Sequence, residues 1–141
     1  MESGCFVCEK HLGRIDVPGG AVHQDELVYV SHGVIPDGKR TAYLGTLFVE
    51  PRRHVAGVAE LTDEEAKRIG VVSSHLARAL KDSEKAEHVY VFVLGHHVSH
   101  LHVWLYPVIR EHRPSTGRCA SRNGPRRRGA VANRSPRSAG E

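Results

Sequence analysis

The sequence of this 141-residue chain predicts an α+β fold. Two observations support the prediction: a helix-capping motif followed by a helical stripe of apolar side chains, and short runs rich in β-forming residues on both sides of it. The length is sufficient for one domain with its own hydrophobic core. We therefore expect a sheet with at least one long helix packed on it.

The predicted helix begins after Thr62. The Thr62 side chain can cap the free amides of the first turn while Glu65 reaches back to the Thr62 amide, and acids in the first turn suit the helix dipole. The helix should run from about Asp63 to Lys81. Its apolar stripe at helical spacing consists of Ile69, Val72, Leu76 and Leu80. We interpret this stripe as the side that faces the core.

Several segments have the composition of strands. Glu26–His32 is the first, and Thr41–Glu50 is a second β-rich run that ends at Pro51. His88–Leu94 is made mostly of valines and aromatic residues, so we expect a buried strand there. These strands flank the predicted helix along the chain, as an α+β arrangement requires.

The last strand is expected at His100–Tyr106, after a turn at Gly95–Ser99. Alternate residues of a strand face the same side, so His100, His102 and Trp104 would share one face and the apolar residues between them would face the core. Imidazole is a metal ligand, a proton carrier and a nucleophile near neutral pH. A histidine pair alone is more often a solvated surface feature, so the rest of the sequence must decide its role.

The C-terminal residues 110–141 differ in composition from the rest. They contain nine Arg and two acidic residues, a formal charge of +7, whereas residues 1–109 have a formal charge of −3. Arg, Ser, Pro, Gly and Ala cannot bury enough surface to offset the chain entropy, so we expect a folded domain over 1–109 and a disordered tail over 110–141. The Arg126–Arg128 run is the only part expected to bind nucleic acid. The alternatives are that the tail is a solvated extension without function, or that it results from a frameshift in the coding sequence.

Cys5 and Cys8 form a C-x-x-C pair near the start of the chain. No apolar stretch there is long enough for a signal peptide and none elsewhere could span a membrane, so we expect a cytoplasmic, reducing environment. In that compartment the pair indicates a metal or redox site rather than a structural disulfide. No strand-like run precedes Cys5, as a thioredoxin-like redox pair would require. A metal is therefore favoured, and a tetrahedral zinc site would need two more ligands.

Three blocks of sequence match one known pattern: Cys5–Cys8, Gly45–His54 and Gly95–Pro107. Together they resemble the histidine triad (HIT) family, including its bacterial nucleotide-binding members with an N-terminal C-x-x-C, and the related galactose-1-phosphate uridylyltransferases. The resemblance covers about residues 5–109, with the helix start after Leu61. It implies an HIT-like fold, an antiparallel meander sheet with one long and one or more short helices, and a homodimer.

The resemblance also implies a metal site and a nucleophile. The family's metal ligands correspond here to Cys5, Cys8, His54 and His100. Four such ligands form a closed site, so the implied Zn²⁺ is structural. The family's nucleophile corresponds to His102, whose other ring nitrogen should donate to a backbone carbonyl. His102 would attack the α-phosphorus of a nucleotide, and the nucleotidyl-histidine would pass its nucleotide to water or a second acceptor.

The implied activity is a nucleotide hydrolase, of the phosphoramidase or dinucleoside polyphosphate type, or a nucleotidyltransferase. A second alignment is open, in which Val98 replaces the first triad histidine and His100 and His102 take the second and third positions. We prefer the alignment that starts at His100. Only that alignment gives Pro107 the family spacing and supplies a histidine to the zinc site.

The third triad position differs from the family, because Trp104 stands where HIT members have His and the uridylyltransferases have Gln. Trp offers one hydrogen-bond donor and no acid–base capacity. Thr46 also stands where many members have His. The residues expected to contact phosphate or nucleotide are Gly95, His96, His97, Val98 and Trp104. The alternative function is a catalytically weak nucleotide-binding protein with the same fold.

Overall fold

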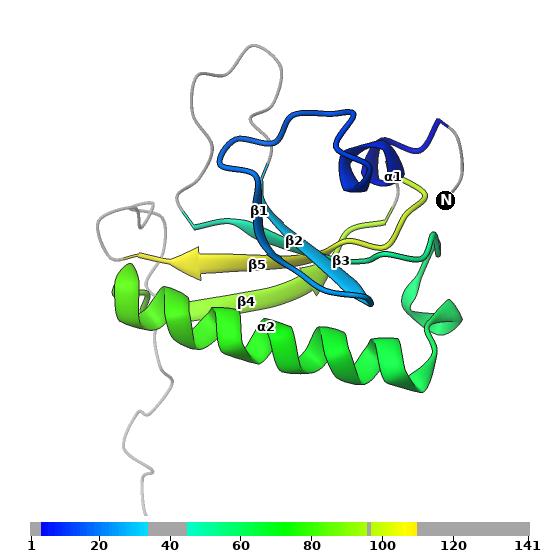
Figure 1. Cartoon of the computed structure of the whole chain (residues 1–141). Coiled ribbons are helices and arrows are strands. Elements are labelled where there is room, and N and C mark those ends of the chain that lie inside the picture. The colour runs from blue at the N-terminus through cyan, green and yellow to red at the C-terminus, as the bar shows by residue number, and fades with distance from the viewer. Residues whose placement is uncertain (1–3, 34–44, 96, 110–141) are drawn as a thin grey trace, which may run out of the picture.

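A computed structural model of the chain describes residues 4–33, 45–95 and 97–109. Within them, the α+β prediction is confirmed: an antiparallel five-stranded sheet packs with few helices (Figure 1). The strands are β1 (Ala21–Gln24), β2 (Val28–His32), β3 (Leu47–Pro51), β4 (His88–Val93) and β5 (Val103–Val108). Their order is β1-β2-β3-β5-β4, so the first three form a meander and β5 lies between β3 and β4. The tail predicted at 110–141 lies outside the described residues.

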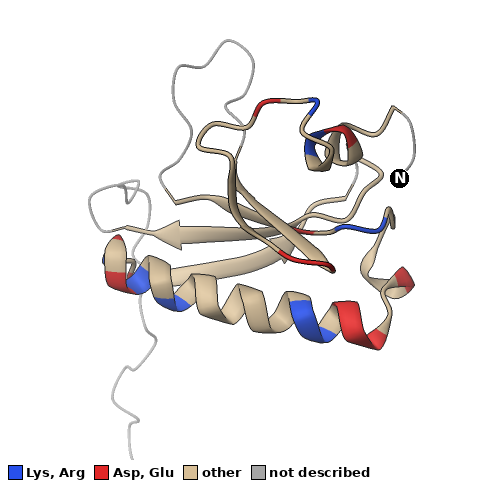
Figure 2. Ribbon diagram, in the orientation of Figure 1, with Lys and Arg blue, Asp and Glu red and all other residues tan. Residues whose placement is uncertain are grey.

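Helix α2 spans Asp63–Ser83 and begins where the sequence predicts, ending two residues beyond the predicted Lys81. The Glu65 amide donates to Thr62 Oγ1 at 3.2 Å, and the Thr62 amide donates to Glu65 Oε2 at 2.9 Å, which completes the capping box. Acidic residues gather in the first turn (Figure 2). A 3₁₀ turn, η1 (Val58–Glu60), precedes α2. No helix in the described part of the chain is long and apolar enough to cross a bilayer.

The hydrophobic core lies between α2 and one face of the sheet (Figure 1). The predicted stripe of α2 faces it: Ile69, Val72 and Leu80 are buried, and Leu76 packs against the same cluster. Alternate residues of the central strands point to this face, as the two-residue period of a strand requires. Their buried apolar side chains are Val28, Val30, Leu47, Val49, Val103 and Leu105.

The opposite face of the sheet is covered in part by α1 (Phe6–His11), a six-residue helix that periodicity could not predict at this length. The last two residues of α1 contact Ser31 of β2 and Glu50 of β3, which alternate with the core residues of those strands. Figure 1 shows α1 and α2 on opposite sides of the sheet. The candidate site lies on the α1 side.

The sequence predicts a buried strand at His88–Leu94. The strand is present, but the prediction that it is buried is wrong. Strand β4 exists, but Tyr90 and Val91 are each 53% exposed and Leu94, just beyond the strand, is 59% exposed. The reason is topological, because β4 is an edge strand with β5 on one side and no described strand on the other. A valine-rich run cannot reveal from sequence whether a second neighbour exists.

Other strand boundaries also differ from the predictions. Strand β2 begins at Val28 rather than Glu26, because Asp25 Oδ1 accepts from the amides of Leu27 and Val28 and forms a turn there. Strand β1 was not predicted. Strand β5 begins at Val103, so the two histidines predicted to alternate within it precede it. Residues 45–50 of the predicted Thr41–Glu50 run are described, and the strand among them, β3, begins at Leu47.

Candidate metal centre and histidine pair

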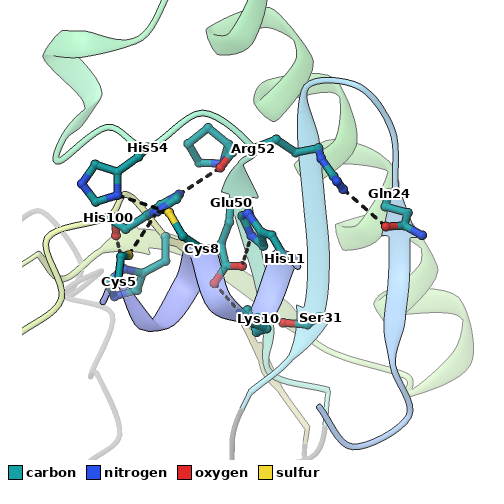
Figure 3. Close-up of polar contacts among 12 residues, drawn as sticks. Cys5, Cys8, Lys10, His11, Gln24, Ser31, Glu50, Arg52, His54 and His100 are labelled. Atoms are coloured by element: carbon teal, nitrogen blue, oxygen red, sulfur yellow. Dashed lines mark hydrogen bonds and ion pairs between the residues drawn. The ribbon is translucent and has the colours of Figure 1, made fainter. Parts of the chain in front are cut away.

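Four side chains from distant parts of the chain meet at the start of α1. They are Cys5, Cys8, His54 and His100. Their ligand atoms all lie within 4.8 Å of one another. His100 Nδ1 is 3.6 Å from Cys5 Sγ and 3.5 Å from Cys8 Sγ, and His54 Nδ1 is 3.4 Å from Cys8 Sγ (Figure 3). The structure thus brings together the four residues that the family resemblance implies.

The three sulfur–nitrogen separations are close to those around one tetrahedral ion. Bonds of about 2.3 Å to sulfur and about 2.0 Å to nitrogen, at the tetrahedral angle, place sulfur and nitrogen about 3.5 Å apart. The sulfur–nitrogen distances of 3.4, 3.5 and 3.6 Å agree with that value. Thiolate and imidazole donors suit zinc, whereas magnesium and calcium prefer oxygen. The cluster can therefore hold a metal ion of the zinc type.

Local backbone structure explains how the four ligands converge. Cys5 is the N-cap of α1 with φ −82° and ψ 118°, and Cys8 follows three residues later on the same side of the helix. His54 follows the end of β3, and His100 lies in the connection from β4 to β5. The Leu101 amide donates to the carbonyl of Val55 at 2.7 Å, which holds these two segments together.

His100 has a defined tautomer. Its Nε2–H donates to the carbonyl of Pro51 at 2.9 Å, so Nδ1 keeps the lone pair that points toward the two thiols. The side chain is fully buried, and this burial lowers the pKa of His100 below its usual value, although the Pro51 carbonyl opposes the shift. His100 is therefore held as a neutral imidazole, the form that binds metal.

His102 differs from its neighbour in both exposure and orientation. It is half-buried, and its Nδ1–H donates to the carbonyl of His100 at 2.7 Å. This is the backbone hydrogen bond expected from the sequence. It leaves the lone pair on Nε2. The ring lies edge to face against Phe48, with 6.0 Å between centroids. The two histidines therefore have different surroundings, one among thiols and one beside aromatic rings.

Trp104 closes an aromatic cluster beside His102. Its indole stacks on Phe92, with 5.8 Å between centroids and 12° between the planes, and it meets Phe48 at 87°. The indole Nε1–H is buried and has no hydrogen-bond partner in the described part of the chain. The residue that the family resemblance assigns to the third triad position therefore supplies apolar contact and one unsatisfied donor.

The loop before the histidine pair lies beside the metal cluster. A pocket of about 450 Å³ is lined by Gly4, Cys5, Phe6, His54, His97, Val98 and Ser99. Of the residues expected to contact phosphate, His97 and Val98 thus border two candidate metal ligands, and Gly95 is exposed. His102 and Trp104 do not line this pocket, and His96 lies outside the described residues.

Sequence reasoning missed a buried polar cluster under α1. Lys10 Nζ donates to Glu50 Oε1 at 2.7 Å and to Ser31 Oγ at 3.1 Å. His11 Nε2 pairs with the other carboxylate oxygen at 3.0 Å, and its ring lies 5.4 Å from that of His100. We call these four residues (Lys10, His11, Ser31, Glu50) the Glu50 network. The one available signal was a carboxylate inside the apolar run of β3.

No protein-family model matches this chain, and no curated protein does. A solved HIT family protein from Bacillus subtilis matches with a TM-score of 0.64 and 25% identity, over 77% of this chain and 76% of that chain. A HIT family hydrolase from Clostridium thermocellum matches with a TM-score of 0.62 and 18% identity, over 82% and 99%. The chain has the histidine triad fold.

A third similar structure is a zinc-bound histidine triad family protein from Mycobacterium smegmatis. The TM-score is 0.65 and the identity 18%, over 84% of this chain and 85% of that chain. The histidine triad fold explains why residues separated by up to 95 positions meet here, because the start of α1 packs beside the β4–β5 connection. The similarity to this zinc-bound protein is one of fold.

Proposed function

We propose that this protein is a zinc-containing nucleotide hydrolase or nucleotidyltransferase that acts at the α-phosphate through His102. The observation that carries the proposal is the 2.7 Å hydrogen bond from His102 Nδ1 to the carbonyl of His100. It fixes the tautomer with a free lone pair on Nε2, which is the nucleophilic form of imidazole. The fold shared with a HIT family hydrolase supports the same activity.

The proposed reaction has two displacements at phosphorus. Nε2 of His102 attacks the α-phosphorus, a phosphorus–nitrogen bond forms, and the leaving group departs with the electron pair of its bond to phosphorus. Water or a second hydroxyl acceptor then attacks, loses its proton to solvent, and returns the electron pair to Nε2. The nucleotide is thereby transferred to water or to the acceptor.

The metal has a structural part in this proposal. Zinc would be held by the four clustered side chains Cys5, Cys8, His54 and His100. When bound, it supplies folding free energy by tying α1 to the end of β3 and to the β4–β5 connection. His100 then has two roles. Its side chain would bind the metal, and its backbone carbonyl accepts the hydrogen bond from His102 Nδ1. In the alternative alignment, with Val98 first, no triad histidine would remain for the metal.

The direct test is turnover of a nucleoside phosphoramidate and of a dinucleoside polyphosphate by wild type and His102→Ala. We expect the variant to lose activity by on the order of 10³-fold or more, because without His102 the nucleotidyl-histidine intermediate cannot form. His75→Ala is the matched control, since His75 is an exposed histidine on α2 and should keep full activity. Equal turnover by wild type and His102→Ala would overturn the proposal.

A second candidate function is nucleotide binding with weak catalysis. It is favoured by Trp104, whose indole can neither accept nor release a proton where a protonated group would assist the leaving group. Calorimetry with purine nucleotides, combined with turnover of Trp104→His, separates the two functions. A gain in turnover for Trp104→His would indicate an enzyme whose activity is weakened by Trp104. Tight binding without turnover in either protein would indicate a binding protein.

We further propose that the protein is a homodimer formed across β4. Val91 and Val93 are 53% and 40% exposed on the edge strand, and Val91 borders an apolar groove of about 460 Å³ along α2. A second copy could cover both the apolar groove and the strand edge, whose unpaired backbone groups would otherwise favour aggregation. Sedimentation velocity should give a dimer for wild type and for Val22→Lys, and a monomer for Val91→Lys. A monomeric wild type would contradict the proposal.

A further inference from the structure

Glu50 is the acceptor through which α1 is attached to the sheet. Its carboxylate binds Lys10 through one oxygen and His11 through the other, at 2.7 and 3.0 Å (Figure 3). The side chains of all three are at most 2% exposed. Both donors belong to the last turn of α1, while the acceptor belongs to β3. Two bonds to two oxygens hold the helix at a fixed position and a fixed rotation.

We propose that Glu50 is a positioning residue for the metal centre. By holding Lys10 and His11, it keeps α1 docked on the sheet whether or not metal is bound, and so aims Cys8 at the histidine ligands. This inference rests on the metal site of the proposed function. It assigns a role to residues that do not contact the metal themselves.

Helix α1 needs such an anchor. Six residues are far below the length at which a helix is stable alone, and the N-cap Cys5 makes no side-chain capping hydrogen bond. The Lys10 ammonium is also held by Ser31 Oγ at 3.1 Å and lies 5.8 Å from the Tyr29 ring centre. A buried carboxylate with no partner is strongly unfavourable, so Glu50 and the Lys10 ammonium require one another.

The Glu50 network also reaches a metal ligand directly. The His11 ring lies edge to face against His100, with 5.4 Å between centroids at 87°, and packs on Tyr29 at 4.7 Å. His100 is therefore confined by His11 on α1 and by its hydrogen bond to the Pro51 carbonyl, one residue after Glu50. Displacement of α1 would disturb Cys5, Cys8 and His100 together, which are three of the four ligands.

The first experiment measures metal affinity of the whole chain with Co²⁺, followed through its thiolate charge-transfer band. Glu50→Gln keeps the shape of the side chain but leaves Lys10 without a counter-charge, and we expect a 10- to 100-fold weaker Kd. The spectrum at saturation should keep the wild-type position, because the four ligands are unchanged. Asp25→Asn is the matched control: it removes an acid that is paired with Arg68 away from α1, and its Kd should equal that of wild type.

The second experiment measures amide hydrogen exchange of residues 9–12 in the metal-free protein, because the hydrogen bonds of α1 run from Glu9 N–H to Cys5 O through Leu12 N–H to Cys8 O. These amides should be protected in wild type and Asp25→Asn, and should exchange at least about tenfold faster in Glu50→Gln. The double variant Lys10→Met/Glu50→Leu removes the buried pair as a whole. It should fold even if Glu50→Gln does not, and it should show the same loss of Co²⁺ affinity.

The outcomes separate the two proposals. Wild-type Co²⁺ affinity and wild-type exchange in both Glu50 variants would overturn the positioning role and leave the metal site standing. Absence of a thiolate charge-transfer band in wild type would overturn the metal site instead. In that case the exchange experiment still decides whether Glu50 anchors α1.

Discussion

The ring of Phe48 meets the indole of Trp104 edge to face, with 4.5 Å between the two ring centroids. Phe48 lies on β3 and Trp104 directly opposite on β5, so their contact is also a cross-strand pair of the sheet. Such aromatic pairs stabilise a sheet beyond the area that they bury. Trp104 thus contributes to the fold, in addition to any role at the position that the family resemblance assigns to the third triad residue.

Replacement of Trp104 should separate these two contributions. Trp104→Ala should lower the free energy of unfolding by about 2–3 kcal/mol, somewhat less than for a fully buried aromatic residue because the side chain is half-buried. Trp104→Phe keeps the contacts with Phe48 and Phe92 and should cost less than about 1.5 kcal/mol. Urea denaturation of the three proteins is the measurement. Equal losses for Ala and Phe would show that the aromatic contacts contribute nothing.

Gly45 should tolerate no side chain. Its φ is +75°, and a Cβ built there would lie 2.9 Å from Pro107 Cγ and 3.0 Å from Leu80 Cδ2. Gly45→Ala should therefore lower the unfolding free energy by about 2 kcal/mol, through backbone strain and crowding together. Gly57→Ala is the control, because a Cβ at Gly57 would meet nothing within 4 Å. Similar melting temperatures for the two variants would refute this expectation.

The capping box should make stability depend on pH in acid. Hydrogen bonds from Arg53, together with one from the Thr62 amide, lower the pKa of Glu65 to about 2. Burial of the carboxyl group partly opposes this shift. A carboxyl whose folded pKa lies below its unfolded pKa stabilises the fold above the unfolded value, near 4.5. That contribution, on the order of 2 kcal/mol, should be lost as the pH falls from about 5 toward 2.

Urea denaturation of metal-free wild type and Glu65→Gln between pH 2 and 6 tests this dependence. Removal of metal matters, because acid would otherwise release it from the cysteines. The stability difference between the two proteins should be largest near pH 6 and should shrink toward pH 2. A difference that stays constant over this range would be inconsistent with a lowered pKa of Glu65.

Metal removal should destabilise the protein through α1. A chelator should lower the melting temperature of wild type by on the order of 10 °C, because a metal that binds only the folded chain stabilises it by mass action. Cys8→Ser should melt near the chelated wild type and should not respond to chelator. Cys119→Ser removes the remaining thiol of the chain and should respond as wild type does. A chelator response in Cys8→Ser would argue against the proposed ligand set.

The long helix could be predicted from sequence because its determinants are local. The Thr62–Glu65 capping box and the stripe from Ile69 to Leu80 lie within one segment, and no distant residue is needed to recognise them. Helix α1 could not be predicted in the same way. It is too short for periodicity, and its stability depends on Glu50, which lies about 40 residues further along the chain.

The residues of the candidate metal site could be predicted from the sequence, but their arrangement in space could not. The motif resemblance named Cys5, Cys8, His54 and His100, which the structure brings together. Periodicity placed His100 and His102 on one face of a strand, whereas β5 begins only at Val103. The packing of the Glu50 network against His100 depends on how α1 docks. Docking of two separated elements leaves no periodic trace in the sequence.

The span between Cys5 and His100 has a consequence for synthesis of the protein. The two residues are 95 positions apart, so the site is the product of one of the longest loop closures in the described chain. A nascent chain presents its C-x-x-C pair to the cell long before His54 or His100 has left the ribosome. During that interval the thiols can meet oxidants or other metal ions with only one another as ligands. We therefore expect the four-ligand centre to be completed only after residue 100 has been synthesised and has folded against α1.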